Sequence, residues 1–117
     1  MIRFTTSQIV ELINSIVVSL SIEADPINEV HQRKAVLRVI EKRDSHLFEL
    51  LEHFINTWES YEFLKKDRDF MMKGRDLWNM QIDLFKSELE KSWGKLKNHL
   101  EEEKIAYTIT TDKENKI

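Results

Sequence analysis

The chain has no cysteine, which excludes both a disulfide framework and a metal site built from thiolates. Only two glycines and one proline occur among its 117 residues. Sheets that form sandwiches or barrels need many tight turns, and tight turns depend on these two residue types. The scarcity of glycine and proline therefore favours an all-α fold over a β architecture.

Long hydrophobic runs are also missing. The most apolar segment, residues 9–22, is too short to cross a bilayer and contains Glu11 and Asn14. It lacks the pure apolar stretch and the small-residue cleavage site of a signal peptide. We therefore expect a cytoplasmic protein that does not bind a membrane. The net charge of -3 gives no overall field that would attract nucleic acid or anionic lipid.

Apolar residues recur at helical spacing along most of the chain. They predict four helices at about 6–21, 26–43, 45–73 and 76–104, arranged as an up-down bundle of two short helices and a long helical hairpin. We expect residues 1–104 to form a single helical domain. Residues 105–117 then alternate apolar and polar side chains at first, which predicts an extended tail that either frays or pairs as a strand with a partner.

Local signals mark the starts of the two short helices. Thr5 and Gln8 have the spacing of a capping box. Asp25 followed by Pro26 is typical of a helix start, because aspartate accepts from unpaired amides and proline needs no donor there.

Two further breaks are predicted. Six polar residues at 41–46 indicate that one helix ends and that Asp44 or Ser45 caps the next, the alternative being one continuous helix. In the hairpin, Gly74 would take the left-handed position after the first long helix, and Asp76 would cap the second. A turn at 65–69 is the alternative.

The long hairpin should project beyond the two short helices at about residues 61–85. Its end carries more apolar side chains than one helix pair can bury. An exposed apolar patch usually marks an interaction site, and methionine adapts to varied partner surfaces. We predict a partner-binding surface there, the alternative being an ordinary core. The predicted contact residues are Phe63, Phe70, Met71, Met72, Leu77, Trp78 and Met80.

The sequence contains no recognisable catalytic constellation. His46, Glu49 and His53 share one helical face, but they make an incomplete metal site, and a solvated face explains them better. The two glycines form no phosphate-binding loop. Asp44 is the one carboxylate at an apolar position of the pattern, and a cap is its simpler role. We expect no catalytic residue, no metal, no cofactor and no enzymatic activity.

The tip of the hairpin is mildly basic. Lys66, Arg68, Lys73 and Arg75 could contact the phosphates of a nucleic acid, with neighbouring aromatic rings stacking on bases. The aspartates between them and the acidic total argue against this use. Nucleic-acid binding is therefore an alternative to our main expectation, and a metal-dependent helical enzyme is a more distant one.

The main expectation is a small non-catalytic protein-binding module of the adaptor, chaperone, immunity or inhibitor type. It would act through the exposed aromatic and methionine residues of the hairpin. Its partner would be another protein, a second copy of the chain, or both, because a homodimer covers the same apolar surface.

Overall fold

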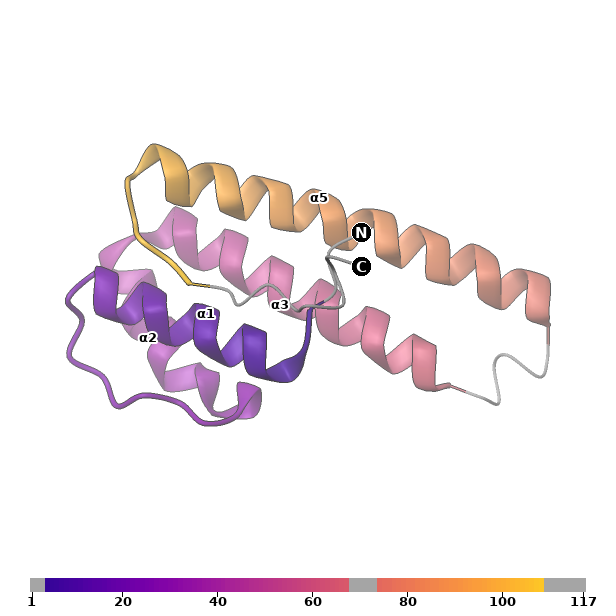
Figure 1. Cartoon of the computed structure of the whole chain (residues 1–117), viewed down its shortest axis with the longest axis horizontal. Coiled ribbons are helices and arrows are strands. Elements are labelled where there is room, and N and C mark those ends of the chain that lie inside the picture. The colour runs from indigo at the N-terminus through magenta and orange to yellow at the C-terminus, as the bar shows by residue number, and fades with distance from the viewer. Residues whose placement is uncertain (1–3, 68–73, 109–117) are drawn as a thin grey trace. The chain divides into compact units, whose positions relative to one another are not determined.

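The computed structural model describes residues 4–67 and 74–108, and all regular structure in these ranges is helical (Figure 1). The predicted all-α fold with four α-helices is confirmed for these residues, while the up-down order of the helices stays a prediction. The elements are α1 (Thr6–Ser19), the 3-10 helix η1 (Val30–Gln32), α2 (Arg33–Arg43), α3 (Ser45–Lys66) and α5 (Arg75–Glu102).

The chain separates into two compact units. Unit 1 comprises Met1–Glu49 and His99–Ile117, and so contains α1, η1, α2, the start of α3 and the end of α5. Unit 2, Leu50–Asn98, contains the remainder of α3 and α5. The single domain over 1–104 and the tail over 105–117 stay predictions.

α1 begins with the capping box that the sequence predicts. The Gln8 amide donates to the Thr5 hydroxyl at 3.2 Å, and the Thr5 amide donates to the Gln8 side-chain oxygen at 2.8 Å. Both amides would otherwise lack a partner at the start of the helix. The buried apolar face of α1 then follows helical spacing and consists of Ile9, Leu12, Ile13, Ile16 and Val17.

α1 ends at Ser19, two residues before the predicted end. The Ser21 amide donates to the Val18 carbonyl at 3.0 Å, and the Ile22 amide donates to the Val17 carbonyl at 3.1 Å. This pair of bonds is a Schellman turn, which requires a left-handed residue, and Ser21 supplies it with a φ of 53°.

The second α-helix begins at Arg33, so the predicted start at residue 26 is wrong. The reason is Asn14 on α1, which binds both peptide groups of Ile27. The Asn14 Nδ2 donates to the Ile27 carbonyl at 2.9 Å, and its Oδ1 accepts from the Ile27 amide at 3.0 Å. In a helix from residue 26 that carbonyl would instead accept from the amide four residues later.

A second side chain holds the next residues outside a helix. The Gln32 Oε1 accepts from the Asn28 amide at 2.8 Å and from the Glu29 amide at 3.2 Å. Regular structure starts only at η1, and Asp25 lies exposed in the preceding segment. The capping role predicted for Asp25 is therefore wrong.

The break predicted between α2 and α3 is confirmed, and the alternative of one continuous helix is wrong. α2 ends at Arg43, and Asp44 has an extended backbone with φ -154° and ψ 96°. Its Oδ1 accepts from the Leu47 amide at 3.0 Å. Asp44 is thus the N-cap of α3, which is the role the sequence predicts for it.

α5 ends in a second Schellman turn within unit 1. The Lys104 amide donates to the Glu101 carbonyl at 3.2 Å, and the Ile105 amide donates to the Leu100 carbonyl at 2.8 Å. Lys104 takes the left-handed position with a φ of 56°. The turn reverses the chain direction, and the helix stops at Glu102 rather than at the predicted residue 104.

The segment after this turn runs along α1. The Thr108 amide donates to the Ser15 hydroxyl at 2.9 Å, and the Ser19 hydroxyl donates to the Ala106 carbonyl. Residues 105–108 have neither helical nor strand structure, and the rest of the predicted tail lies outside the described residues.

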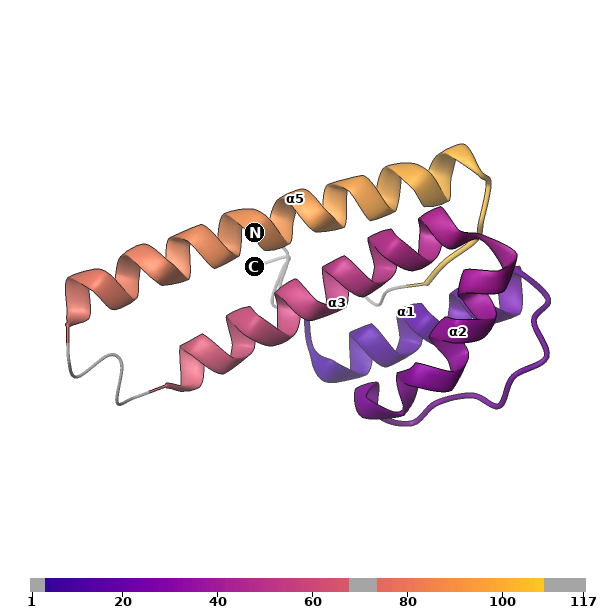
Figure 2. The ribbon, with the colours of Figure 1, turned by 180° about the vertical axis from the view of Figure 1, so that it is seen from behind.

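In unit 2, α3 and α5 lie side by side and run in opposite directions (Figures 1 and 2). The rings of Phe54 and Trp93 pack with their centroids 5.3 Å apart. Further along, the Trp78 indole Nε1 donates to the Leu64 carbonyl at 3.0 Å. Residue numbers rise along one helix as they fall along the other, as an antiparallel pair requires. The buried apolar side chains here are Leu51, Phe54, Ile55, Trp58, Leu64, Leu89, Trp93 and Leu96.

The end of α3 and the start of α5 differ from the main prediction, while residues 68–73 between them lie outside the described residues. α3 ends at Lys66 instead of residue 73, because 65–69 are all charged and give the helix no side chain to bury. Gly74 stands before α5, where its carbonyl accepts from the Trp78 amide at 2.9 Å, and its φ is not positive. Asp76 lies within the first turn of α5, where its charge suits the helix dipole. The roles predicted for Gly74 and Asp76 are therefore wrong.

Candidate functional site

The start of α5 is fixed to the end of α3 by one side chain. Trp78 is half-buried, and its indole N–H donates to the Leu64 carbonyl at 3.0 Å. That carbonyl also accepts from the Asp67 amide at 3.1 Å, so both of its lone pairs are used. The bond positions the neighbouring side chains, Phe63 and Leu77, at the same end of the hairpin.

Three exposed apolar side chains follow one face of α5 near its start. Leu77, Met80 and Leu84 are 52%, 61% and 58% exposed. Their spacing of three and four residues places them one above the other on the helix. We call these three residues the α5 strip. The same face continues with exposed Glu88 and Lys91, so the apolar surface ends after Leu84.

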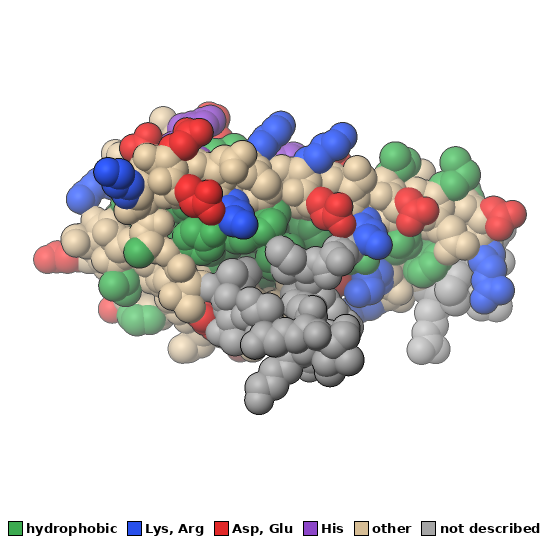
Figure 3. Space-filling view, turned by 45° about the horizontal axis from the view of Figure 1, so that its top comes forward, with side chains coloured by type: hydrophobic (Ala, Val, Ile, Leu, Met, Phe, Trp, Pro, Cys, Tyr) green, Lys and Arg blue, Asp and Glu red, His purple; other side chains and the backbone are tan. Residues whose placement is uncertain are grey.

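The α5 strip is not part of the buried face of the helix. Leu89, Trp93 and Leu96 are buried, and they lie close to half a turn around the helix from the strip. Figure 3 shows hydrophobic side chains on the surface at this end of α5, next to acidic and basic ones. Phe63 adds a further ring that is 74% exposed on the last turn of α3.

The structure thus places the predicted contact residues in two groups. Phe63, Leu77 and Met80 are exposed, and Trp78 is half-buried because its ring turns toward α3. The predicted set omits Leu84, although its spacing from Leu77 and Met80 could have indicated it. The remaining predicted contacts lie outside the described residues; they are Phe70, Met71 and Met72.

The basic residues of the hairpin tip are divided in the same way. Lys66 and Arg75 are exposed, whereas Arg68 and Lys73 lie outside the described residues. Their use in binding nucleic acid stays a prediction. The neighbouring Lys65 is engaged within α3, where its Nζ lies 3.3 Å from the Glu62 carboxylate and 5.2 Å from the centre of the Tyr61 ring.

Asp44, His99 and His46 form a cluster in unit 1. The His99 Nε2 lies 2.9 Å from the Asp44 Oδ2, and the rings of His46 and His99 meet edge to face with centroids 4.9 Å apart. The sequence indicated Asp44 as unusual but gave no signal for its pairing with His99, because 55 residues separate them.

The Asp44 carboxyl is held in its ionised form. Burial alone raises its pKa, but hydrogen bonds from His99 and from the Leu47 amide, with the charge of His99, outweigh burial and lower the pKa below its ordinary value. A carboxyl that transfers protons near neutral pH needs a raised pKa instead. The arrangement therefore suits a cap and an ion pair.

Three further titratable residues of α3 do not converge on a common site. His46, Glu49 and His53 are all exposed. Within residues 4–67 and 74–108, no group of three or more suitable side chains could hold a metal ion. The absence of catalysis, metal and cofactor stays a prediction.

None of the helices in the described ranges has both the length and the apolar character needed to cross a membrane. Comparisons of the chain with protein-family models, with curated proteins and with solved structures give no match. The function proposed below therefore rests on the arrangement of this chain's own side chains.

Proposed function

We propose that the chain is a small non-catalytic protein-binding module, and that it binds its partner through the α5 strip together with Phe63. The observation that carries the proposal is the exposure of these four large apolar side chains, each more than half accessible, at one end of the α3–α5 hairpin. Scattered exposed apolar residues are ordinary, but residues stacked on one helical face form a continuous surface.

The chemistry of the α5 strip suits a protein partner. Met80 is unbranched and polarizable, so it can adapt to an irregular apolar surface. Leu77 and Leu84 extend the contact along the helix in the way an amphipathic helix fills a groove. Charged neighbours such as Asp76 and Asp83 border the strip, as a polar rim borders an interface core.

The size of the strip sets the expected affinity. Burying a large apolar side chain completely contributes about 1.5–3 kcal/mol, so covering the exposed parts of these four would contribute about 5 kcal/mol. Association itself costs at least about 4 kcal/mol in lost freedom. The strip and Phe63 alone would thus give only weak binding, and a stable complex needs a partner that also contacts the surrounding residues.

The experiment that tests the proposal compares three forms of the tagged full chain in affinity capture from cells that produce it. They are wild type, the strip variant Met80→Lys with Leu84→Lys, and the control Asn79→Lys with Asn98→Lys. The control adds the same charge to the same helix at exposed positions, Asn79 on another face of the helix and Asn98 well beyond the end of the strip. Because the strip side chains are exposed, all three should keep the same helix content and melting temperature.

We expect wild type and control to capture the same specific protein and the strip variant to lose it. Native mass of the purified chain is measured in parallel, because a second copy of the chain could be the partner. A dimer that persists in the control and dissociates in the strip variant would identify self-association. Equal capture and equal mass in all three forms would contradict the proposal.

A further inference from the structure

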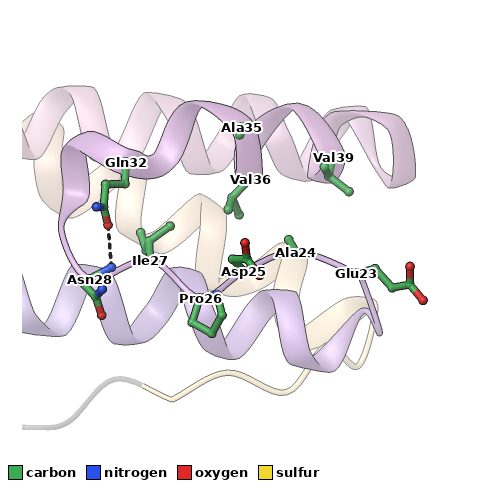
Figure 4. A pocket seen from close by; sticks show the side chains of 10 residues that line it. All are labelled: Glu23, Ala24, Asp25, Pro26, Ile27, Asn28, Gln32, Ala35, Val36 and Val39. Atoms are coloured by element: carbon green, nitrogen blue, oxygen red, sulfur yellow. Dashed lines mark hydrogen bonds between the residues drawn. The ribbon is translucent and has the colours of Figure 1, made fainter.

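A groove lies between α2 and the segment that connects α1 to it. Its larger part is an open cavity of about 470 Å³ between α2 and residues 23–28 (Figure 4). A second cavity of about 300 Å³ shares Glu23 and Val39 with the first and extends to Lys42 and Arg43. We call the two together the α2 groove. All of its lining residues belong to unit 1.

One wall of the α2 groove is a stripe along α2. Val36, which is almost fully buried, and the half-buried Val39 lie three positions apart and form its apolar centre. Figure 4 shows Val36 pointing from α2 toward the opposite segment. Gln32 stands at one end of the stripe and Arg43 at the other. An apolar centre with polar ends is typical of a binding groove.

The opposite wall is an extended segment that is held at both ends. The Schellman turn at Ser21 fixes where it begins. Asn14 then holds Ile27 through two hydrogen bonds of 2.9 and 3.0 Å. Burial alternates along it, with Ile22 and Ala24 more buried than the residue that follows each of them, as in a β-strand. The groove is therefore formed before any ligand arrives, which lowers the entropy lost on binding.

The backbone amides in the middle of this wall make no hydrogen bond within the part of the chain that the structure describes. The amides of Glu23, Ala24 and Asp25 donate no hydrogen bond to any part of the chain that the structure describes, whereas the amides of Ile22 and Ile27 on either side are bonded. An ordered, extended segment with free peptide groups is the kind of edge to which a partner chain adds as a strand.

Charge along the groove limits which chain would fit. Glu23 and Asp25 are exposed on the extended wall, and no cation lies within ion-pair distance of either in the described residues. Lys42 and Arg43, also without an ion pair there, stand at the far end. A chain with a basic residue beside Asp25 and an acidic group near Arg43 would match both ends.

We propose that the α2 groove binds an extended peptide segment of another protein. The segment would pair with the free peptide groups that face one edge of residues 23–25, place apolar side chains over Val36 and Val39, and set a lysine or arginine against Asp25. The groove is open along its length, so it suits a chain better than a small molecule, which needs most of its surface enclosed. This site is separate from the α5 strip and does not depend on it.

The test begins with selection of random twelve-residue peptides, displayed on phage, against the full chain. Selected peptides are synthesised, and their affinities are measured for wild type, for Asp25→Lys, and for Val39→Asp. Glu90→Lys is the matched control, because it makes the same charge change as Asp25→Lys at an exposed position on α5. Leu84→Lys reports any peptide that binds the α5 strip instead.

We expect peptides that alternate apolar and polar residues and carry a basic residue at one end and an acidic residue at the other. Their Kd should rise about tenfold or more with Asp25→Lys and with Val39→Asp and stay unchanged in the two α5 variants. Amide hydrogen exchange at residues 23–25 should slow when peptide is added. The proposal is overturned if no peptide is enriched, if the groove substitutions leave affinity unchanged, or if only Leu84→Lys weakens binding. Exchange at 23–25 that does not change on binding would overturn the strand pairing.

Discussion

The indole Nε1 of Trp78 donates to the backbone carbonyl of Leu64 at 3.0 Å, and this bond ties the first turn of α5 to the last turn of α3. It holds the Trp78 ring against α3. Trp78 packs toward α3, whereas Leu77 and Met80 on either side of it in sequence point to solvent.

Replacing Trp78 by phenylalanine keeps an aromatic ring but removes the donor. We expect Trp78→Phe to lower the free energy of unfolding by about 1–2 kcal/mol, from the lost hydrogen bond and the smaller ring. Chemical denaturation measures this change. Tyr61→Phe is a control that removes a polar group from a half-buried ring on α3 without touching the Leu64 carbonyl. An equal effect of both substitutions would show that the Trp78 bond does not stabilise the hairpin.

The capping role of Asp44 predicts different effects for two substitutions. Asp44→Ala removes the acceptor for the Leu47 amide and should cost about 1 kcal/mol of stability, within the usual range for a lost N-cap. Asp44→Asn keeps a good capping oxygen and should cost less at neutral pH. The free energy of unfolding of each variant checks this order, and an asparagine variant as unstable as the alanine variant would contradict it.

The same carboxyl predicts a pH dependence. Because the folded-state pKa of Asp44 is lowered, its contribution to stability is fully present above the unfolded-state pKa of about 3.9 and is lost as the pH falls through the folded value. The difference in unfolding free energy between wild type and Asp44→Asn should therefore shrink as the pH is lowered from about 5 to 2. A difference that stays constant over this range would show that ionisation of Asp44 does not stabilise the fold.

Among the residues that the structure describes, two other than glycine occupy left-handed positions, Ser21 with a φ of 53° and Lys104 with a φ of 56°. A residue with a side chain pays roughly 1 kcal/mol of steric strain in this conformation, and glycine does not. Part of this gain is offset because glycine loses more conformational entropy when the chain folds. We expect Ser21→Gly and Lys104→Gly each to stabilise the protein by about 0.5 kcal/mol. Thermal unfolding tests this. Ser7→Gly, inside α1, should destabilise and serves as the control.

Asn14 stabilises the segment before η1 through two hydrogen bonds to Ile27. Asn14→Ala should cost about 1–3 kcal/mol, because both peptide groups of a buried residue lose their partners. Asn14→Asp keeps the acceptor but sets a carboxylate oxygen against the Ile27 carbonyl, so it should destabilise at least as much as alanine. If the alanine variant unfolds at the same denaturant concentration as wild type, Asn14 does not hold this segment.

The features of the fold that depend on residues close together in the sequence could be predicted from the sequence. The Thr5 cap and the Asp44 cap each join residues three apart, and such pairs follow from spacing alone. The start of α2 could not be predicted, because it is set by Asn14 and Ile27, which are thirteen residues apart and adjacent only in the folded chain. Asp25 and Pro26 have the local chemistry of a helix start, and this tertiary contact overrides it.

The candidate site likewise has some features that the sequence predicts and others that depend on tertiary contacts. The spacing of the apolar residues at the start of α5 indicates that there are more of them than one buried face of the helix can hold. The exposed side chains of Leu77 and Met80 agree with this expectation. Periodicity does not indicate that the Trp78 ring turns toward α3, because its acceptor, the Leu64 carbonyl, lies fourteen residues away on another helix. The α2 groove also has no sequence signature, since its extended wall depends on the tertiary hydrogen bonds between Asn14 and Ile27.

The most direct test of the proposed function is the rate at which peroxide oxidises Met80 in the isolated monomer and in the complex with the captured partner. Oxidation of methionine follows its exposure. We predict that Met80 in the monomer reacts nearly as fast as free methionine, and that the complex slows the reaction about tenfold or more. Slow oxidation in the monomer, or equal rates in both states, would contradict a partner-binding surface on the α5 strip.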